Sequence, residues 1–230
     1  MADGLFVGID GTDGGGKKTQ IDLLSEHLIA RGHDVLIADF PQYGELSAGP
    51  VEMYLRGELG TAEQIGAKRA ATLYAVDRFC ASPRLWSWLR EGKMVLSNRY
   101  VAANLAYQGA KISDPGERKA FWEWNLRLEY EFYGIPRPLL NLILDVPAEV
   151  AFDLVGKKGE RAYLKGMKRD IHEEDREYLE RSIEVYRELV HCYPNEFRLI
   201  ECTAGGRMLP KEHIAILIWN EIRALLERSR

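Results

Sequence analysis

A glycine-rich segment, Gly11–Gln20, stands directly after the apolar run Leu5–Ile9 and before a stretch whose apolar residues recur at helical spacing. A strand, a loop and a helix in this order point consecutive backbone N–H groups at one spot, where the helix dipole favours negative charge. Glycine is needed because the backbone must curl through unusual dihedral angles without a Cβ in the way. Lys17 adds a positive charge near the end of the segment. The pattern predicts a loop that cradles phosphate groups.

Apolar runs bounded by turn residues recur along the rest of the chain. After Leu5–Ile9 they are Val35–Phe40, Met94–Ser97, Leu140–Val146 and Phe197–Cys202. They lack strict polar and apolar alternation, which is typical of strands buried on both faces of a parallel sheet. Helical patterns lie between them; the first contains Ile21, Leu24, Leu28 and Ile29 and ends at Arg31 and Gly32. We predict an α/β, three-layer fold in which helices flank a five-stranded parallel sheet, as one domain spanning residues 1–230.

Two long segments between the predicted strands have compositions that suggest roles beyond connecting the strands. Tyr100–Pro138 holds more aromatic and apolar residues than one helix stripe can use, so we expect part of it to pack on an accessory helix or a partner subunit. Residues 156–170 are poor in large apolar side chains and rich in Lys, Arg and Gly. This composition predicts a short basic lid.

Charge and composition exclude several classes of partner. The formal net charge of -4 gives no general attraction to nucleic acid, and the basic residues form no wide stripe. No apolar run is long enough to cross a bilayer and the N-terminus does not resemble a signal peptide, so we expect a cytoplasmic protein without a membrane partner. Cys80, Cys192 and Cys202 form no C-x-x-C pair, which disfavours disulfides or structural zinc and favours buried free thiols.

Four segments, in the same order, resemble the thymidylate kinases, a family of P-loop nucleoside-monophosphate kinases. Gly11–Gln20 matches the family loop G-x-D-G-x-G-K-[ST]-T-Q except at Lys18, and Asp39–Gly44 is similar to its Phe-Pro segment. Thr72–Arg78 resembles its aromatic-x-x-x-Arg helix, and Ser97–Gly109 resembles D-R-Y-x-x-S-x-x-A-Y-Q-G. The resemblance implies a homodimeric enzyme that phosphorylates dTMP to dTDP with ATP, accompanied by Mg²⁺.

The resemblance also implies roles for individual residues. For ATP it implies Gly11, Asp13, Gly14, Gly15, Gly16, Lys17, Lys18, Thr19 and Gln20, with Lys165 and Arg169 from the lid. For dTMP it implies Asp13, Tyr43, Tyr74, Arg78, Arg99, Asn104, Tyr107 and Gln108. The expected catalytic residues are Lys17, Arg99 and Arg161, the last because Gly15 leaves the loop itself without an arginine.

Within the dTMP set, the guanidinium of Arg99 has the bidentate fork that a phosphate needs, with Tyr43 beside it. The resemblance gives Tyr74 the stacking of the base and Arg78 the base oxygen. Asn104 is expected to read the base edge. Asp13 is implied to accept from the sugar 3′-hydroxyl, while the ring of Tyr107 would exclude a 2′-hydroxyl.

Three positions depart from the family pattern. Gln42 stands where many relatives keep an arginine, which suggests weaker affinity for the acceptor phosphate. Lys18 replaces a hydroxyl and Asn98 replaces an aspartate, both near magnesium, so each change raises the local charge by one unit. One hypothesis is that the Lys18 ammonium partly replaces the protein's hold on the metal. The alternative is that Lys18 points to solvent, and the metal ligands stay unassigned.

Other functions remain open from the sequence. The same scaffold could phosphorylate another deoxynucleoside monophosphate, since a few side chains decide base identity. Lys18 and Asn98 together also suggest a catalytically weak or silent nucleotide-binding relative. A GTPase is disfavoured because the chain has no N-K-x-D segment.

Overall fold

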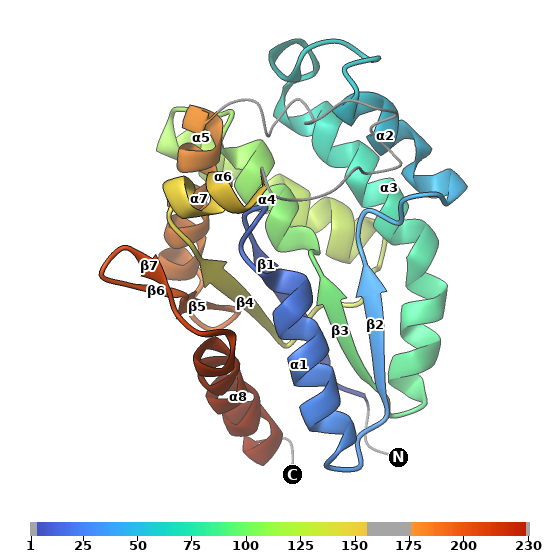
Figure 1. The fold of residues 1–230 in the computed structure, drawn as a ribbon. Coiled ribbons are helices and arrows are strands. Elements are labelled where there is room, and N and C mark those ends of the chain that lie inside the picture. Colours follow the sequence, from blue (N-terminus) through green and yellow to red (C-terminus); the bar gives the residue numbers. More distant parts are fainter. Residues whose placement is uncertain (1–3, 156–175, 229–230) are drawn as a thin grey trace.

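A computed structural model describes residues 4–155 and 176–228 and shows helices on both faces of a central sheet (Figure 1). The sheet consists of β1 (Phe6–Gly11), β2 (Val35–Asp39), β3 (Met94–Asn98), β4 (Leu140–Asp145) and β5 (Phe197–Glu201). All of its pairings are parallel, in the order β2-β3-β1-β4-β5, so β1 is central. The predicted α/β class and parallel sheet are confirmed. The predicted lid lies outside the described residues.

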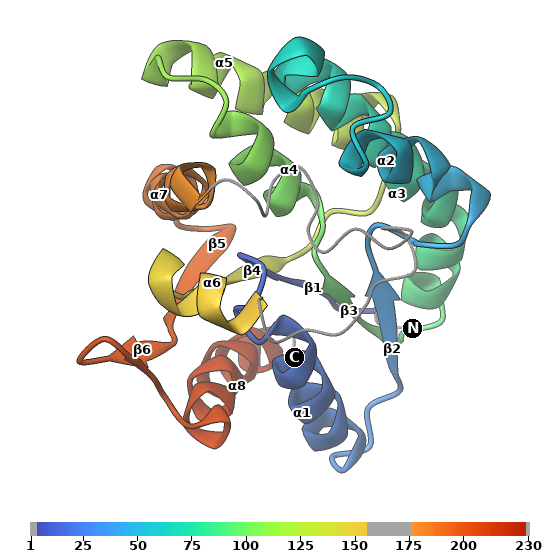
Figure 2. The same ribbon diagram turned by 45° about the horizontal axis from the view of Figure 1, so that its top comes forward.

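Helices enclose two cores, one on each face of the sheet (Figure 2). On one face pack α1 (Lys17–Ile29) and α8 (Lys211–Arg228), and on the other α3 (Ala62–Arg90), α4 (Val101–Gly109), α5 (Pro115–Leu126) and α7 (Arg176–Cys192). The shorter elements are η1 (Leu46–Ala48), α2 (Gly49–Leu55), the π-helix η2 (Arg127–Phe132), α6 (Ala148–Val155) and a hairpin of β6 (Thr203–Ala204) and β7 (Arg207–Met208). Burial on both faces explains why the strands read as continuous apolar runs.

The helix predicted after the glycine-rich loop is present as α1. Leu24 and Leu28 are buried against the sheet, but Ile29, which the spacing placed on the same stripe, is 56% exposed. The helix ends as predicted, because Gly32 adopts a positive φ of 84° and its N–H donates to the carbonyl of Ile29.

The aromatic segment after β3 serves mainly the chain's own core. Phe121 and Trp122 on α5 are buried, and Trp122 donates to the carbonyl of Leu105. The thiol prediction is wrong for Cys80 and Cys192, which are exposed. None of the helices in the described ranges is long and apolar enough to span a membrane.

Candidate active site

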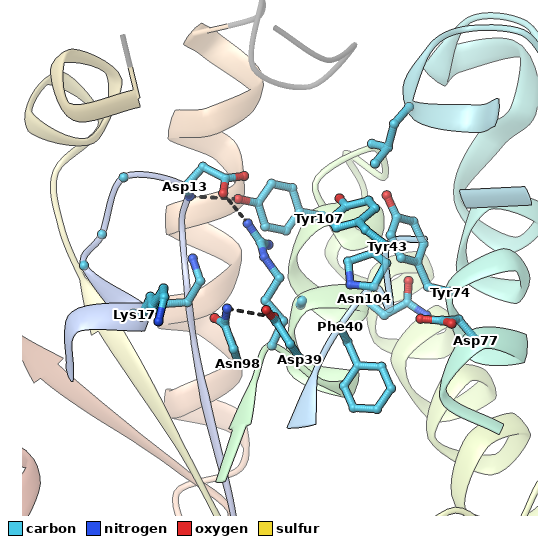
Figure 3. A pocket seen from close by; sticks show the side chains of 18 of the residues that line it. Asp13, Lys17, Asp39, Phe40, Tyr43, Tyr74, Asp77, Asn98, Asn104 and Tyr107 are labelled. Atoms are coloured by element: carbon cyan, nitrogen blue, oxygen red, sulfur yellow. Dashed lines mark hydrogen bonds and ion pairs between the residues drawn. The ribbon is translucent and has the colours of Figure 1, made fainter. Parts of the chain in front are cut away.

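A cavity of about 590 Å³ opens at the carboxyl ends of β1, β2 and β3. Strand ends meet at this edge in parallel α/β sheets, which is where such folds bind ligands. It is lined by every predicted nucleotide-binding residue within the described ranges except Gly11 and Gln20. Figure 3 shows Lys17 on one side of this cavity and Tyr43, Tyr74 and Asn104 on the other. The lid residues Arg161, Lys165 and Arg169 lie outside the described part of the chain.

The phosphate loop has the curled backbone that its glycines predicted. Gly14 and Gly16 adopt positive φ angles of 82° and 80°, and Gly16 is the N-cap of α1. The buried ammonium of Lys17 folds back over the loop and donates to the carbonyl oxygens of Gly11 at 3.0 Å and Thr12 at 2.8 Å. Lys17 is therefore already positioned at the centre of the loop, with its charge next to the space that a phosphate would fill.

Two residues at the ends of the loop have structural roles instead of contacts with the cavity. Gly11 passes so close to β4 that a Cβ would lie 2.7 Å from the carbonyl oxygen of Leu144. Gln20 turns its side chain toward α8, where Nε2 donates to the carbonyl of Lys211 at 3.1 Å. For the side chain of Gln20, the predicted contact with ATP is therefore corrected to a contact between α1 and α8.

Lys18 points along the outer surface of α1. Its Nζ pairs with the carboxylate of Asp22 at 3.0 Å, and its side chain is 81% exposed. This favours the alternative in which Lys18 points to solvent, because its ammonium is exposed and pairs with Asp22 one helical turn away.

Arg99 projects into the cavity from a strained turn. It adopts a φ of 63°, which is rare for a residue with a Cβ, and its N–H donates to the carbonyl of Ile9. The next N–H, that of Tyr100, donates to the buried carboxylate of Asp10 at 3.1 Å. Burial raises the pKa of Asp10, while the positive charges of Arg99 and Lys17 oppose that rise. Asp10 thus fixes the backbone that aims Arg99.

The guanidinium of Arg99 lies between the loop and α4. Nη2 pairs with Asp13 at 2.6 Å, and Cζ stands 5.3 Å from the ring centre of Tyr107. The backbone N–H of Asp13 donates to the Tyr107 hydroxyl at 3.3 Å. Arg99, which follows β3, therefore holds the phosphate loop and α4 together through Asp13 and Tyr107, and all three residues line the cavity.

At the far end of the cavity, hydrogen bonds fix the orientation of the side-chain amide of Asn104. Nδ2 of Asn104 donates to the carbonyl of Ala71 at 3.0 Å, to Oδ1 of Asn125 at 3.2 Å and to Oε1 of Glu129 at 3.2 Å. Because three acceptors surround Nδ2, the amide cannot be reversed without placing oxygen against oxygen. Oδ1 of Asn104 is buried with no partner in the described structure and is left as the acceptor for a ligand.

Glu129, in the π-helix η2, is the centre of this polar cluster. It is completely buried and accepts from Arg78 through Nε at 2.5 Å and Nη2 at 2.8 Å, as well as from Asn125 at 2.9 Å. Arg78 was predicted to bind a base oxygen; it lines the cavity, but one edge of its guanidinium is committed to Glu129. Only the remaining N–H groups of Arg78 can serve a ligand.

Asp77 organises the segment after β2. It accepts from the backbone N–H of Gln42 at 2.9 Å, from Gln42 Nε2 at 3.1 Å and from the Ser47 hydroxyl at 2.6 Å. Arg84 donates to the Gln42 oxygen at 2.8 Å. Gln42 is thus used within the fold, whereas Phe40, Pro41 and Tyr43 of this segment line the cavity, and Tyr43 is 43% exposed.

Comparison with known proteins decides the family. The family model described as thymidylate kinase matches residues 9–205, most of the chain and all of the cavity except Met208. The chain belongs to the thymidylate kinase family. The predicted family is thereby confirmed, and the chain is an enzyme of the nucleoside-monophosphate kinase class.

Individual relatives agree with the thymidylate kinase assignment. The thymidylate kinase of Mycobacterium tuberculosis is 35% identical over 187 residues, which cover 80% of this chain and 85% of the relative. That of Caulobacter vibrioides is 31% identical and covers 75% of this chain and 79% of its own length. The structure of thymidylate kinase from Candida albicans superimposes with a TM-score of 0.72 at 19% identity, over 100% of this chain and 95% of that one. This likeness supports the fold.

Sequence reasoning missed three carboxylates that organise the thymidylate kinase site: Asp10, Asp77 and Glu129. Asp10 directly precedes the predicted phosphate loop and Asp77 directly precedes Arg78, whereas Glu129 lies two residues before another acidic residue, Glu131. An ionisable residue inside a buried strand, as Asp10 is in β1, was the available signal, because such a group is rarely buried without partners.

Proposed function

We propose that the chain transfers the γ-phosphoryl group of ATP to dTMP. One observation carries the proposal: a single cavity joins a phosphate-binding loop, a central arginine and an amide acceptor at its far end. In this arrangement the loop and Lys17 bind the donor phosphates, Arg99 binds the acceptor phosphate, and Tyr74 and Asn104 bind the base.

The proposed mechanism needs alignment and positive charge more than covalent chemistry. Lys17, held over the loop by two carbonyl groups, neutralises charge on the donor phosphates. Arg99, anchored by Asp13, holds the acceptor phosphate in line. The predicted lid with Arg161, Lys165 and Arg169 remains part of the proposal as the group that closes over ATP.

We also propose Mg²⁺ as the companion of ATP. No group of three or more His, Cys, Asp or Glu side chains in the described residues could hold a metal alone, which suits an ion that keeps waters and phosphate ligands. The oxygens of Asp39 and Asn98 at the cavity floor are of the hard kind that Mg²⁺ prefers. When bound, Mg²⁺ offsets negative charge on the phosphates.

The orientation of the Asn104 amide predicts which base the site prefers. Its Oδ1 can accept from the N3–H of thymine or uracil, whereas N3 of cytosine is itself an acceptor. We expect kcat/KM for dTMP to exceed that for dCMP by about 10⁴-fold, because a mismatched base would leave buried polar groups unpaired. A coupled assay with ATP, Mg²⁺ and dTMP, dUMP, dCMP or thymidine measures this ratio. ATP binding without ADP formation for any of them would favour the silent relative.

We further propose a cytoplasmic homodimer, with the partner bound at α3. Val76, Phe79 and Trp86 follow one another at helical spacing and stay exposed, and Phe132 of η2 beside them is 80% exposed. Apolar side chains gathered in this way are typical of a protein interface. The opposite side of α3 carries Tyr74 toward the cavity, so a partner there would stiffen the base-binding wall.

A charge placed in this α3 surface should separate the subunits. We expect Phe79→Asp to convert a dimer into a monomer, because a carboxylate cannot be buried there without a partner. Size-exclusion chromatography with light scattering measures the mass. Ile216→Asp on α8, at a residue 58% exposed on the other face of the sheet, is the matched control and should leave the mass unchanged. A wild-type chain that runs as a monomer at every concentration would contradict the proposal.

A further inference from the structure

Two polar side chains meet at the floor of the cavity, where β2 and β3 end. Asp39 and Asn98 occupy paired positions in the register of these strands, and Nδ2 of Asn98 donates to Oδ1 of Asp39 at 2.8 Å. Figure 3 shows the pair between Lys17 on one side and Tyr74 and Asn104 on the other. It therefore lies between the loop proposed for the donor phosphates and the pocket proposed for the base.

The hydrogen bond fixes which atoms of the pair can meet a ligand. Because Nδ2 of Asn98 is used by Asp39, its Oδ1 is directed elsewhere, and this oxygen is buried with no hydrogen-bond partner in the described structure. Asp39 remains exposed to the cavity. The two side chains together present a carboxylate and an amide oxygen, which suits a positively charged or donating ligand.

Asp39 is also the cavity carboxylate with the fewest partners. Asp13 pairs with Arg99 at 2.6 Å, and Asp77 accepts from Gln42 and Ser47. Among the described residues no Lys or Arg forms an ion pair with Asp39, and its hydrogen bond comes from a neutral amide. Positive charge from Arg99, Lys17 and Lys18 reaches it only at longer range.

We propose that Asp39, oriented by Asn98, is the residue through which this chain holds the divalent cation that accompanies ATP. The Asp39 carboxylate supplies the negatively charged oxygen and Asn98 Oδ1 a neutral one. The remaining ligands are phosphate oxygens and water, as Mg²⁺ generally retains. The inference rests on the proposed function, since it assigns the metal-holding residue of that same site.

The test separates metal binding from nucleotide binding. The affinity of the non-hydrolysable analogue adenosine 5′-(β,γ-imido)triphosphate is measured by isothermal titration calorimetry, once with MgCl₂ and once with EDTA. We expect Asp39→Asn to weaken binding about tenfold with Mg²⁺, as loss of a metal-supporting carboxylate does. With EDTA the same variant should bind as well as wild type or more tightly, because a negative charge near the phosphates is gone. A folding defect would weaken both.

Two further variants sharpen the result. The double variant Asp39→Asn with Asn98→Asp keeps the net charge and allows the same hydrogen bond, but it moves the carboxylate to β3. We expect its affinity for the analogue in MgCl₂ to return toward that of wild type. Glu221→Gln removes a partly exposed carboxylate from α8 that pairs with Arg198 away from the cavity, and should change neither affinity.

Equal weakening of Asp39→Asn in both conditions, no weakening in either, or failure of the exchanged pair to recover would overturn the inference. These results are distinct from failure of the proposed function. If wild type phosphorylates dTMP and Asp39→Asn keeps its Mg²⁺ dependence, this inference alone is wrong. If wild type binds the analogue neither with MgCl₂ nor with EDTA, both this inference and the proposed function are wrong.

Discussion

Replacing Arg99 by Ala is expected to lower kcat/KM for dTMP by about 10³-fold, and replacing it by Lys by about 10²-fold. Arg99 is aimed by a turn at φ 63° and held by Asp13 and Tyr107, so its guanidinium is in place before a phosphate arrives. Such preorganisation is lost with either variant, and a lysine provides a charge without the bidentate fork. A coupled assay that varies dTMP at saturating ATP measures the change.

Arg84→Lys is the matched control for this experiment. Arg84, on α3, donates to Gln42 in the segment after β2 and does not line the cavity. Its replacement should leave kcat/KM within about twofold, as for a surface contact. If Arg99→Lys had no greater effect than this control, Arg99 could not be the residue that holds the acceptor phosphate.

Removing the carboxylate of Glu129 should have the largest effect on stability. Arg78 is 3% exposed and Glu129 is fully buried, so Glu129→Ala leaves a buried guanidinium without its counter-ion. Loss of one partner of a buried pair costs about 3–5 kcal/mol in the free energy of unfolding. Urea denaturation of the ligand-free chain measures this free energy.

Two comparisons distinguish this role from general sensitivity to mutation. Glu188→Ala breaks the partly exposed pair with Arg118, whose nitrogen and oxygen are 2.8 Å apart, and should cost less than about 1 kcal/mol. Glu129→Gln preserves the volume but can turn its NH₂ toward Nδ2 of Asn104, so the preference for dTMP over dCMP should also fall. A variant with lower stability and unchanged base preference would refute the link between Glu129 and the orientation of Asn104.

Much of the fold could be predicted because its determinants are local. All five strands of the sheet were placed to within a few residues, since strands buried on both faces appear as short apolar runs. Gly14 and Gly16 marked the curled loop and Lys17 its charge, because only glycine adopts those dihedral angles without strain. The hairpin of β6 and β7 was not predicted because strands of two residues are too short to show an apolar periodicity in the sequence.

The sequence alone determined the order of strands and helices, the phosphate loop and the resemblance to a kinase family, because glycine geometry and apolar periodicity act over a few neighbouring residues. Only the tertiary structure decided which polar groups meet. Glu129 reaches Arg78 across 51 residues of sequence, and Asp39 reaches Asn98 across 59. Lys18, by contrast, turns to its neighbour Asp22. Partner choice among buried charges depends on strand register and helix packing, which no local pattern encodes.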